Sequence, residues 1–393
     1  MSESGRRARV AIVRAGEYDP SLLSAAIAKA VRLTGGLETV IKPGARVFVK
    51  INHLPPPSPP ERGIVTHPVF TEAVISLLKA AGAHVIVGDE IETGAADGFL
   101  ASGYREMCRR AGVRLVNLRE EGFAATGCNG RLLSEVYLSR IASEADVIIN
   151  LPKLKTHSLT VLTGGVKNMY GIIPVSERRR LHGEYPDSDD FSQMLVDVFA
   201  GAPTHLTIMD GVVAMEGEGP AGGSTRRLGV ILASRDTVAV DATAAAIIGI
   251  DPQDIGTTRH AHQRGLGTGS LDSIEVLGES LSSVAVSDFR MPASASRRFL
   301  RRVPAPLTRF TIRQLSVRPR VVEHACAACG ECVRACPTGA IAINDGTAAI
   351  DRALCIGCMC CHEVCRYDAV TTERTPVGHV VERLSGWLRA LSR

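Results

Sequence analysis

The sequence predicts an α/β body followed by a small cysteine-rich domain at the C-terminus. Short β-rich runs alternate with helical stretches from residue 8 to about 280, which is typical of a largely parallel sheet. Nine of the 11 cysteines then fall in the last 68 residues. A chain of 393 residues is also too long for one typical domain, so two or more domains are expected.

The elements of the body can be placed by their apolar runs. Eight strands are predicted, at residues 9–13, 46–51, 84–88, 114–118, 146–151, 205–209, 227–233 and 274–277. Helices are predicted at residues 21–33, 68–81, 102–111, 190–199 and 238–248, and several of them close on glycine, as helix C-termini often do. Residues 124–138 form a predicted hairpin at the edge of the sheet.

Charge and hydropathy exclude some classes of protein. The 45 Lys and Arg against 41 Asp and Glu leave a net charge of +4, which indicates no particular partner. No apolar run approaches the roughly 20 residues that a membrane span needs. The Arg6-Arg7 pair lacks the long apolar segment of an export signal, so we expect a cytoplasmic protein in which disulfides are unlikely to explain the cysteines.

The cysteine spacing is the strongest signal in the chain. Cys326-x2-Cys329-x2-Cys332-x3-Cys336-Pro is followed by Cys355-x2-Cys358-x2-Cys361-x3-Cys365, so the whole pattern occurs twice. Three thiolates two residues apart can surround one iron–sulfur cube, and in ferredoxins with two clusters the fourth cysteine ligates the other cube. We therefore predict two [4Fe-4S] clusters, bound by the sets Cys326, Cys329, Cys332, Cys365 and Cys355, Cys358, Cys361, Cys336.

A pair of structural zinc sites is the alternative, but zinc modules usually separate two CxxC pairs more widely. Two details deviate from the ferredoxin pattern. Arg366 stands where a proline often follows the last cysteine, and Cys360 is an additional thiol between two predicted ligands. We interpret Cys360 as a packed or hydrogen-bonding thiol.

These signals divide the chain into a body at 8–280, an Arg-rich linker at 281–322, a ferredoxin-like domain at 323–375 and an amphipathic tail helix at 376–393. The linker is a solvated connector, a docking site for an acidic electron donor, or a contact with an anionic membrane surface. Nucleic acid is disfavoured because aromatic residues that could stack bases, such as Phe299 and Phe310, are scarce there. Packing against the protein itself is the favoured role of the tail, and peripheral membrane contact is not favoured.

Polar residues gather where the apolar runs of the body end, which is where α/β folds place their ligands. They comprise Lys50, Asn52, Thr66, His67, Asp89, Lys153, Lys155, His157, Lys167, Asn168 and Asp210. Four lysines at such positions indicate a positive pocket for a carboxylate or phosphate, with solvated surface lysines as the plainer reading. We assign catalysis to Lys155, His157 and Lys167, and substrate binding to Lys50, Asn52, Lys153 and Asn168.

Alternatives remain for several of these residues. His67 either supplies a proton or caps the helix that Pro68 begins, and the cap is favoured. His157 either supplies a proton or hydrogen-bonds a loop carbonyl. Asp89 and Asp210 could hold a divalent ion with His157, although carboxylates at strand ends more often cap helices. Gly217-x-Gly219-x-x-Gly222 lacks the strand–helix context of a dinucleotide site and is interpreted as a loop over the pocket.

Several segments resemble an uncharacterised iron–sulfur-centre family, domain of unknown function 362, over roughly residues 8–280. They are Thr66-His-Pro68, Lys153-Leu-Lys-Thr-His157, Gly165-Val-Lys-Asn168, Asp236-Thr-Val-Ala-Val-Asp241 and, in the cysteine module, Ile-Gly-Cys-Met-Cys-Cys361. Members of this family often append a two-cluster ferredoxin. The resemblance implies redox work without an agreed substrate.

Three functions follow from these observations. The first is an oxidoreductase that takes electrons from a low-potential donor, a ferredoxin or flavoprotein, and passes them to an anionic substrate in the body. The second is an electron carrier whose body only docks a partner enzyme. The third is a redox-sensing or cofactor-assembly protein. A closed pocket within reach of a cluster would favour the first, and a flat docking face the second.

Overall fold

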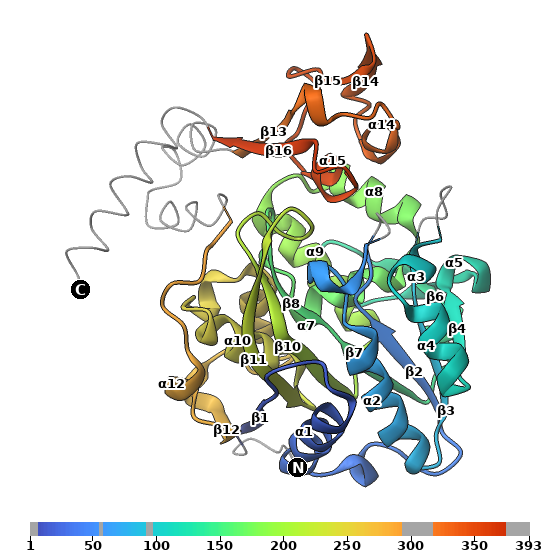
Figure 1. Ribbon diagram of the computed structural model, residues 1–393, viewed down its shortest axis with the longest axis vertical. Coiled ribbons are helices and arrows are strands. Elements are labelled where there is room, and N and C mark those ends of the chain that lie inside the picture. Colours follow the sequence, from blue (N-terminus) through green and yellow to red (C-terminus); the bar gives the residue numbers. More distant parts are fainter. Residues whose placement is uncertain (1–6, 55–57, 92–96, 293–316, 375–393) are drawn as a thin grey trace, which may run out of the picture.

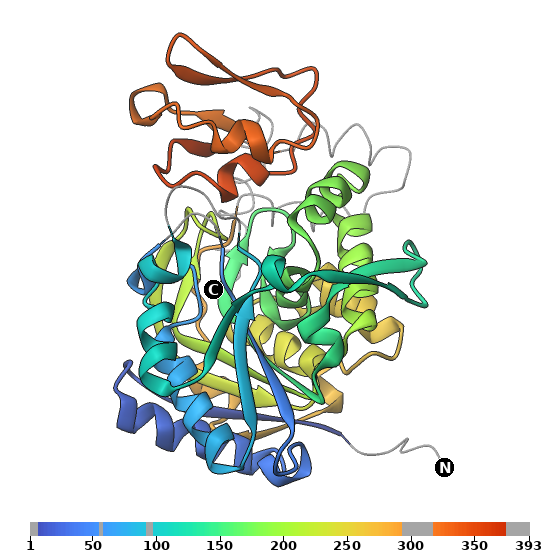
Figure 2. The same cartoon turned by 90° about the vertical axis from the view of Figure 1, so that its right-hand side faces the viewer.

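The computed structural model describes residues 7–54, 58–91, 97–292 and 317–374. Figures 1 and 2 show an α/β body with a small module of short strands and helices above it. The predicted fold class, a largely parallel α/β body with a small C-terminal domain, is confirmed.

The main sheet has ten strands, and its central path runs β12-β1-β11-β10-β7-β2-β3-β4. Neighbours are parallel along β7, β2, β3 and β4, and antiparallel where β11 meets β1 and β10. The strands are β1 (Ala8–Arg14), β2 (Arg46–Ile51), β3 (His84–Asp89), β4 (Arg114–Asn117), β7 (Val147–Leu151), β8 (Lys153–His157), β9 (Val161–Leu162), β10 (Leu206–Glu216), β11 (Ser224–Ser234) and β12 (Ile274–Gly278).

Helices cover both faces of this sheet, which explains why its central strands are apolar throughout. In β2, Val47 and Val49 pack into the core formed with α1 (Pro20–Leu33), α2 (Pro68–Ala80) and α4 (Tyr104–Ala111). Phe48 points the other way, into the core formed with α7 (Gly164–Asn168) and α9 (Ser188–Gly201). The remaining helices of the body are α3 (Gly98–Ala101), α5 (Leu118–Glu121), α6 (Arg140–Glu144), α8 (Val175–Glu184), α10 (Thr237–Ile247), α11 (Gly256–Gln263) and α12 (Leu281–Val284).

Three details of the body differ from the prediction. The hairpin forms as expected, but β5 (Phe123–Gly127) and β6 (Glu135–Ser139) make a separate two-stranded sheet. Residues 153–157, predicted to follow a strand, are themselves strand β8, because Pro152 separates them from β7 and they pair with β10. Asp210, predicted to end a strand, lies inside β10, which continues to Glu216.

The C-terminal module repeats one small unit. Its outer strands β13 (Val317–Val321) and β16 (Val370–Arg374) pair with each other, and β14 (Ile341–Asn344) pairs with β15 (Thr347–Ile350). Each cysteine run passes through a short helix, α14 (Glu331–Ala335) or α15 (Cys360–Glu363). Five cysteines join the small apolar core of the module, so its interior is built largely around thiols.

The predicted linker is shorter at both ends than the sequence suggested. Residues 317–321 form β13 of the module, and Phe289 is buried in the core around α10. The backbone N–H of Val286 also donates to the carbonyl of Ile247. Most of the predicted linker arginines (297, 298, 301, 302, 309 and 313) and the tail at 376–393 lie outside the described residues. Among the described helices, none is both long and apolar enough to cross a membrane.

Candidate functional site

The structure brings the cysteines of each predicted set together. Cys336 lines one cavity with Cys355, Cys358 and Cys361, although it comes from the other cysteine run. In the first set, burial and then the nearby thiols of Cys329, Cys365 and Cys326 raise the pKa of Cys332. The crossing of the fourth cysteine between sets is the arrangement that two cubes require.

Backbone N–H groups point at three of these sulfurs. Ala340 donates to Cys336 Sγ at 3.3 Å, Ala348 to Cys326 Sγ at 3.4 Å and Ala369 to Cys365 Sγ at 3.2 Å. Such donors stabilise the negative charge of a thiolate-bound cluster. In the described parts of the chain, no three His, Cys, Asp or Glu side chains are placed to hold a single metal ion.

In the body, two of the four predicted lysines are neutralised by carboxylates. Lys50 Nζ lies 2.8 Å from Asp89 Oδ2, and both side chains are buried. Lys153 Nζ lies 2.8 Å from Asp210 Oδ2 and donates to the Tyr18 hydroxyl at 2.6 Å. The prediction that these lysines bind an anionic substrate is not supported, because each already has an anion beside it. The alternative of Asp89 and Asp210 as metal ligands is not supported, because each carboxylate already has a lysine ammonium beside it.

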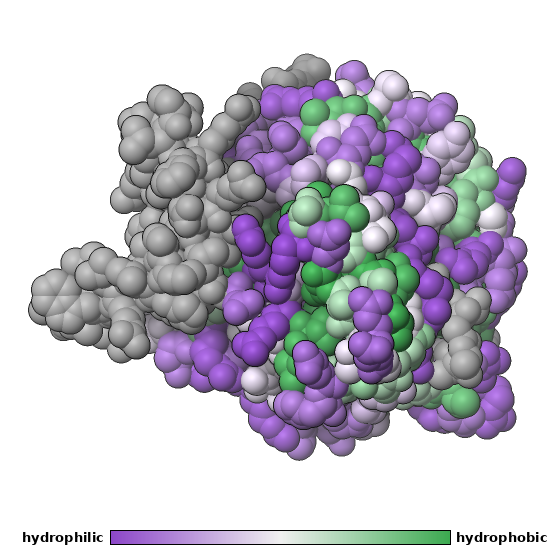
Figure 3. Space-filling model, turned by 90° about the horizontal axis from the view of Figure 1, so that it is seen from above, coloured by the Kyte–Doolittle hydropathy of each residue, from purple (hydrophilic) through white to green (hydrophobic). Residues whose placement is uncertain are grey.

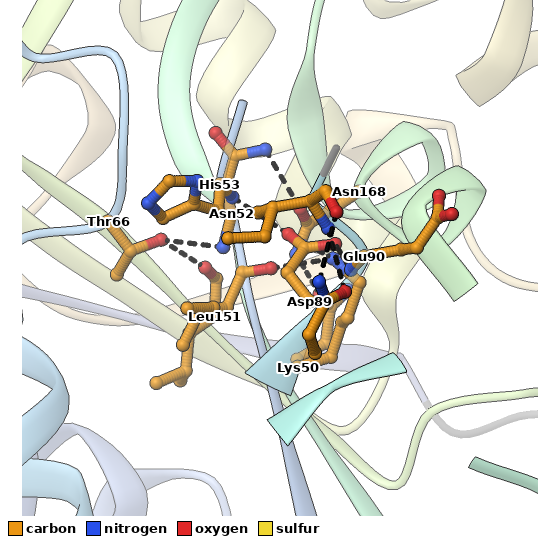
Figure 4. A network of polar contacts seen from close by, with 12 residues as sticks. Lys50, Asn52, His53, Thr66, Asp89, Glu90, Leu151 and Asn168 are labelled. Atoms are coloured by element: carbon orange, nitrogen blue, oxygen red, sulfur yellow. Dashed lines mark hydrogen bonds and ion pairs between the residues drawn. The ribbon is translucent and has the colours of Figure 1, made fainter. Parts of the chain in front are cut away.

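An amide ladder runs beside the Lys50–Asp89 pair (Figure 4). Asn52 Nδ2 donates to Asn168 Oδ1 at 2.9 Å, and Asn168 Nδ2 donates to Asn150 Oδ1 at 2.7 Å. The Thr66 hydroxyl accepts from the backbone N–H of Asn52 and donates to the Leu151 carbonyl. This ladder fixes the carboxyl ends of β2 and β7 relative to α7. The side-chain Oδ1 of Asn52 has no partner among the described residues.

Helix α7 is held by a carboxylate from α10. Asp241 accepts the backbone N–H groups of Gly165 at 2.5 Å and Val166 at 3.0 Å, and burial raises its pKa to about 7. Gly164 has φ +59°, and a Cβ there would lie 2.7 Å from the Asp241 carboxylate. Only glycine fits such a turn. The turn sets the direction of α7 and so places Lys167 and Asn168.

The predicted residues meet in one cavity of about 40 Å³ at the carboxyl ends of β2 and β3. Lys50, Asn52, Lys155, His157, Lys167 and Asn168 all line it, whereas Lys153 does not. This volume suffices for a few water molecules or a small anion. Sequence reasoning missed Tyr170 and Arg178, which also line it. Arg178 is held by the buried carboxylate of Glu90, which accepts from its guanidinium.

Lys155 and Lys167 are the cations of this cavity that lack a carboxylate within ion-pair distance among the described residues. Lys155 is fully buried, and its Nζ donates to the Ile64 carbonyl at 2.6 Å. Burial and the neighbouring charge of Lys167 hold the pKa of Lys155 well below its usual value. Burial also lowers the pKa of Lys167, although the charge of Glu363 opposes this shift. Asp89 lines the cavity but is paired with Lys50, so Lys155 and Lys167 are left without a carboxylate partner among the described residues.

His157 joins the body to the module. Its Nδ1 accepts the backbone N–H groups of Leu159 and Thr160, so the neutral ring carries its proton on Nε2. Nε2 faces Glu363 Oε1 of α15 at 3.1 Å, but the groups are not aligned for a hydrogen bond. Burial and the charge of Lys167 lower the pKa of His157 to about 4. Burial alone would raise the pKa of the Glu363 carboxyl. The neighbouring His157, Lys167 and His182 outweigh burial, so the pKa of Glu363 lies below its usual value.

A second cavity of about 110 Å³ lies between the body and the module. It shares Leu54, Lys167, Tyr170 and Arg178 with the first cavity. Cys360 lines it from the module and also lines the cavity of the second cysteine set. Cys360 is therefore a buried thiol between the predicted cluster site and the space beside Lys167, which its sequence position alone did not reveal.

Two other predictions concern the edges of the site. His67 caps α2, accepting the backbone N–H of Val69 at 3.3 Å, which confirms the favoured reading. Residues 217–223 are the loop between β10 and β11, and a strand follows them, as predicted. Pro220 of this loop lines the cavity, and a Cβ on Gly222 would lie 2.7 Å from the His362 ring of α15. The loop therefore contacts both the body cavity and the module.

These features define an α/β protein with an appended iron–sulfur module. Residues 47–246 match the domain of unknown function DUF362, and residues 318–341 match a 4Fe-4S binding domain. The chain belongs to the DUF362 family, and it carries a 4Fe-4S binding domain with the electron-transfer character of such domains.

A thylakoid-associated protein of Synechocystis sp. is 33% identical over 259 residues, covering 65% of this chain and 79% of that protein. Among solved structures, the lactate racemase apoprotein from Thermoanaerobacterium thermosaccharolyticum aligns with a TM-score of 0.41 and 11% identity. That alignment covers 60% of this chain and 56% of that chain.

Proposed function

We propose that this protein is an oxidoreductase that passes electrons from a low-potential donor through two [4Fe-4S] clusters to a small anionic substrate in the body. The observation that carries the proposal is the connection of two cavities. The cavity that contains Lys155 and Lys167 shares four lining residues with the interface cavity. Cys360 lines both the interface cavity and the cavity of the second cysteine set, so it lies between them.

The cysteine sets would hold the clusters as the sequence predicts. Cys326, Cys329, Cys332 and Cys365 form one set, and Cys355, Cys358, Cys361 and Cys336 form the other. Such clusters supply one electron at a time, so a two-electron reduction would draw one electron from each. Cys329 of the first set is exposed, whereas Cys358 and Cys361 of the second are buried. This difference supports donor access at the first set and delivery from the second.

The charges of the cavity support an anionic substrate. Lys50 and Lys153 are already paired, so Lys155 and Lys167 are left to attract an anion. Asn52 adds an unpartnered side-chain oxygen that could accept a hydrogen bond from the substrate. His157 lines the same cavity as a neutral imidazole with its N–H on Nε2, which could donate a hydrogen bond to an oxygen of the substrate.

The alternative of a simple electron carrier finds support on the outer face of the module. Ile343 and Leu354 of the module are exposed, at 39% and 51%. Figure 3, seen from the side of the module, shows apolar residues gathered near the middle with hydrophilic residues around them. A patch of this kind is typical of a docking face. We assign this apolar patch to the docking of the low-potential donor, a ferredoxin or flavoprotein, because an oxidoreductase also needs an electron donor.

The first experiment is anaerobic purification followed by iron and acid-labile sulfide analysis, which should yield the content of two clusters. The reduced protein is then mixed with small anions, including oxyanions and carboxylates, and cluster reoxidation is followed by absorbance and electron paramagnetic resonance. Lys167→Met is the test variant, and Lys42→Met, at an exposed lysine, is the matched control.

At least one anion should reoxidise the wild type and Lys42→Met at equal rates. Lys167→Met should be roughly tenfold slower or more, equivalent to about 1.4 kcal/mol. If no anion reoxidises the clusters while a partner protein does, the protein is a carrier. If both variants behave alike, Lys167 does not bind the substrate.

A further inference from the structure

Lysine is scarce in this protein and unevenly placed. The sequence has only seven lysines among its 45 basic Lys and Arg residues. Lys29, Lys42 and Lys79 are exposed on the surface of the body. The other four are Lys50, Lys153, Lys155 and Lys167, all within the segments that build the candidate site. Any chemistry specific to a buried lysine is therefore easy to locate in this chain.

The three fully buried lysines differ in their partners. Lys50 has the Asp89 carboxylate and the Ile51 carbonyl. Lys153 has the Asp210 carboxylate and the Tyr18 hydroxyl. Lys155 has the Ile64 carbonyl as its one hydrogen-bond acceptor among the described residues.

This difference matters because an ammonium group has three N–H donors and needs an anion when it is buried. Lys155 would leave two of those donors without a protein acceptor. A neutral amine fits better, since one N–H satisfies the Ile64 carbonyl and the nitrogen lone pair stays available. The low pKa of Lys155, caused by burial and then by the charge of Lys167, agrees with this arrangement. A desolvated lysine beside a second cation is a nucleophile of the kind that forms Schiff bases.

We propose that Lys155 is a nucleophilic amine that forms an imine with the carbonyl carbon of a small 2-oxo acid, whose carboxylate is held by Lys167. This inference rests on the proposed function, because it names the class of anionic substrate that the same cavity accepts. Lys167 suits the carboxylate because it is only partly buried, and its Nζ has no ion pair or hydrogen bond to another described residue.

The size of the cavity limits the substrate. A volume of about 40 Å³ excludes large ligands and fits a molecule of two or three carbons. The carboxylate and the carbonyl of a 2-oxo acid are adjacent, so two neighbouring lysines can engage both. Asn168 and Tyr170 line the same space and restrict the orientation of the substrate.

Imine formation needs neither an oxidant nor a reductant. The Lys155 lone pair attacks the carbonyl carbon, and a proton moves from nitrogen to oxygen to give a carbinolamine. The hydroxyl then departs with the second amine proton as water, and the C=O bond has been replaced by a C=N bond. His157 lines the cavity with its proton on Nε2 and could assist the departure of the hydroxyl.

The test traps the imine in the purified, cluster-loaded protein. Glyoxylate or pyruvate is added with cyanoborohydride, and the labelled lysines are located by peptide mass spectrometry. We expect labelling of Lys155 that saturates with oxo-acid concentration. The exposed Lys29, Lys42 and Lys79 should label slowly and linearly, and the paired Lys50 and Lys153 should stay unlabelled.

Two comparisons sharpen this test. Lys167→Met should raise the oxo-acid concentration needed for half-labelling of Lys155 by roughly tenfold or more. Labelling by acetaldehyde, which has no carboxylate, should weaken less in the same variant, because only the effect of Lys167 on the pKa of Lys155 is then lost. Lys155→Met should remove the saturable label while retaining iron content and the circular dichroism of the wild type. If wild-type Lys155 labels no faster than the exposed lysines, the inference is wrong.

The failure of this inference is distinguishable from the failure of the proposed function, since trapping uses no electrons from the clusters. Saturable labelling without any cluster reoxidation would overturn the oxidoreductase and support the imine. Reoxidation by a small anion without labelling would support the oxidoreductase and overturn the imine.

Discussion

Replacing Asp210 with asparagine removes the only carboxylate beside the buried ammonium of Lys153. The two groups lie 2.8 Å apart with side chains 0% exposed, so no water can replace the lost charge. Breaking a buried pair on one side typically costs about 3–5 kcal/mol. The loss has a ceiling, because Lys153 can instead release its proton. At pH 7 that release costs at most about 4.6 kcal/mol, from a reference pKa near 10.4 at about 1.36 kcal/mol per pH unit.

The same reasoning predicts how the loss depends on pH. At pH 9 the cost of releasing the proton falls to about 1.9 kcal/mol, so the deficit of Asp210→Asn should shrink by up to about 2.7 kcal/mol. The free energy of unfolding is measured by urea titration at both pH values, with far-ultraviolet circular dichroism reporting the body. The control is Glu106→Gln, which breaks the exposed Arg109–Glu106 pair and should change stability little.

A double variant separates charge from packing. Lys153→Met with Asp210→Asn removes the buried ammonium and keeps a side-chain oxygen that can accept from the backbone N–H groups of His67 and Val212, so it should recover much of the loss. The reasoning is refuted if Asp210→Asn is no less stable than Glu106→Gln at pH 7. It is also refuted if the deficit stays the same at pH 9, because the lysine would then not be the source of the cost.

Three further predictions concern other parts of the molecule. Gly164→Ala should destabilise the body by roughly 1–3 kcal/mol more than Gly44→Ala. Both glycines have positive φ, but only at Gly164 would the added Cβ lie 2.7 Å from Asp241. Equal losses of the free energy of unfolding in urea titrations would contradict this prediction. Burial lowers the pKa of His182 to about 3, so the unfolded state binds its proton first, and stability falls as pH decreases from 6.5 towards 3. His182→Phe should remove about 1.4 kcal/mol per pH unit of that slope, whereas His84→Gln, at an exposed site, should not; parallel curves would argue against it. Removal of iron by a chelator should unfold the module and leave the body folded, which hydrogen exchange can resolve by segment; an unchanged module would contradict a cluster-dependent fold.

The sequence predicted the fold class and the cysteine module well because both signals are local. The spacing of Cys326, Cys329 and Cys332 is set by one turn of chain, and strand–helix alternation is visible within short windows. The strand order could not be predicted, since it depends on contacts between distant segments. The same limit hid strand β8, whose pairing with β10 brings together residues about 60 positions apart.

The partners of the lysines could not be predicted from the sequence for the same reason. The sequence grouped Lys50, Lys153 and Lys155 as one kind of site residue, but it could not show which of them had a carboxylate partner. Asp89 reaches Lys50 because β2 and β3 are neighbours in the sheet. Asp210 reaches Lys153 because β8 pairs with β10. Lys155 has no such neighbour, and only the assembled sheet reveals the difference.

The interface between body and module gives Lys155 and Lys167 their setting. Glu363 supplies the nearest opposing charge to both, yet it belongs to the module and faces His157 rather than forming an ion pair with either lysine. A protein that only carried electrons would gain nothing from burying Lys155 and Lys167 without carboxylate partners beside its cluster module, because burying such groups costs stability. Buried groups that lack a partner within the protein are usually found at functional sites, where a bound ligand supplies the partner. Lys155, Lys167, the unaligned His157–Glu363 contact and the buried Cys360 thiol all lie around the same two connected cavities, where a bound anion would supply the carboxylate that Lys167 lacks among the described residues.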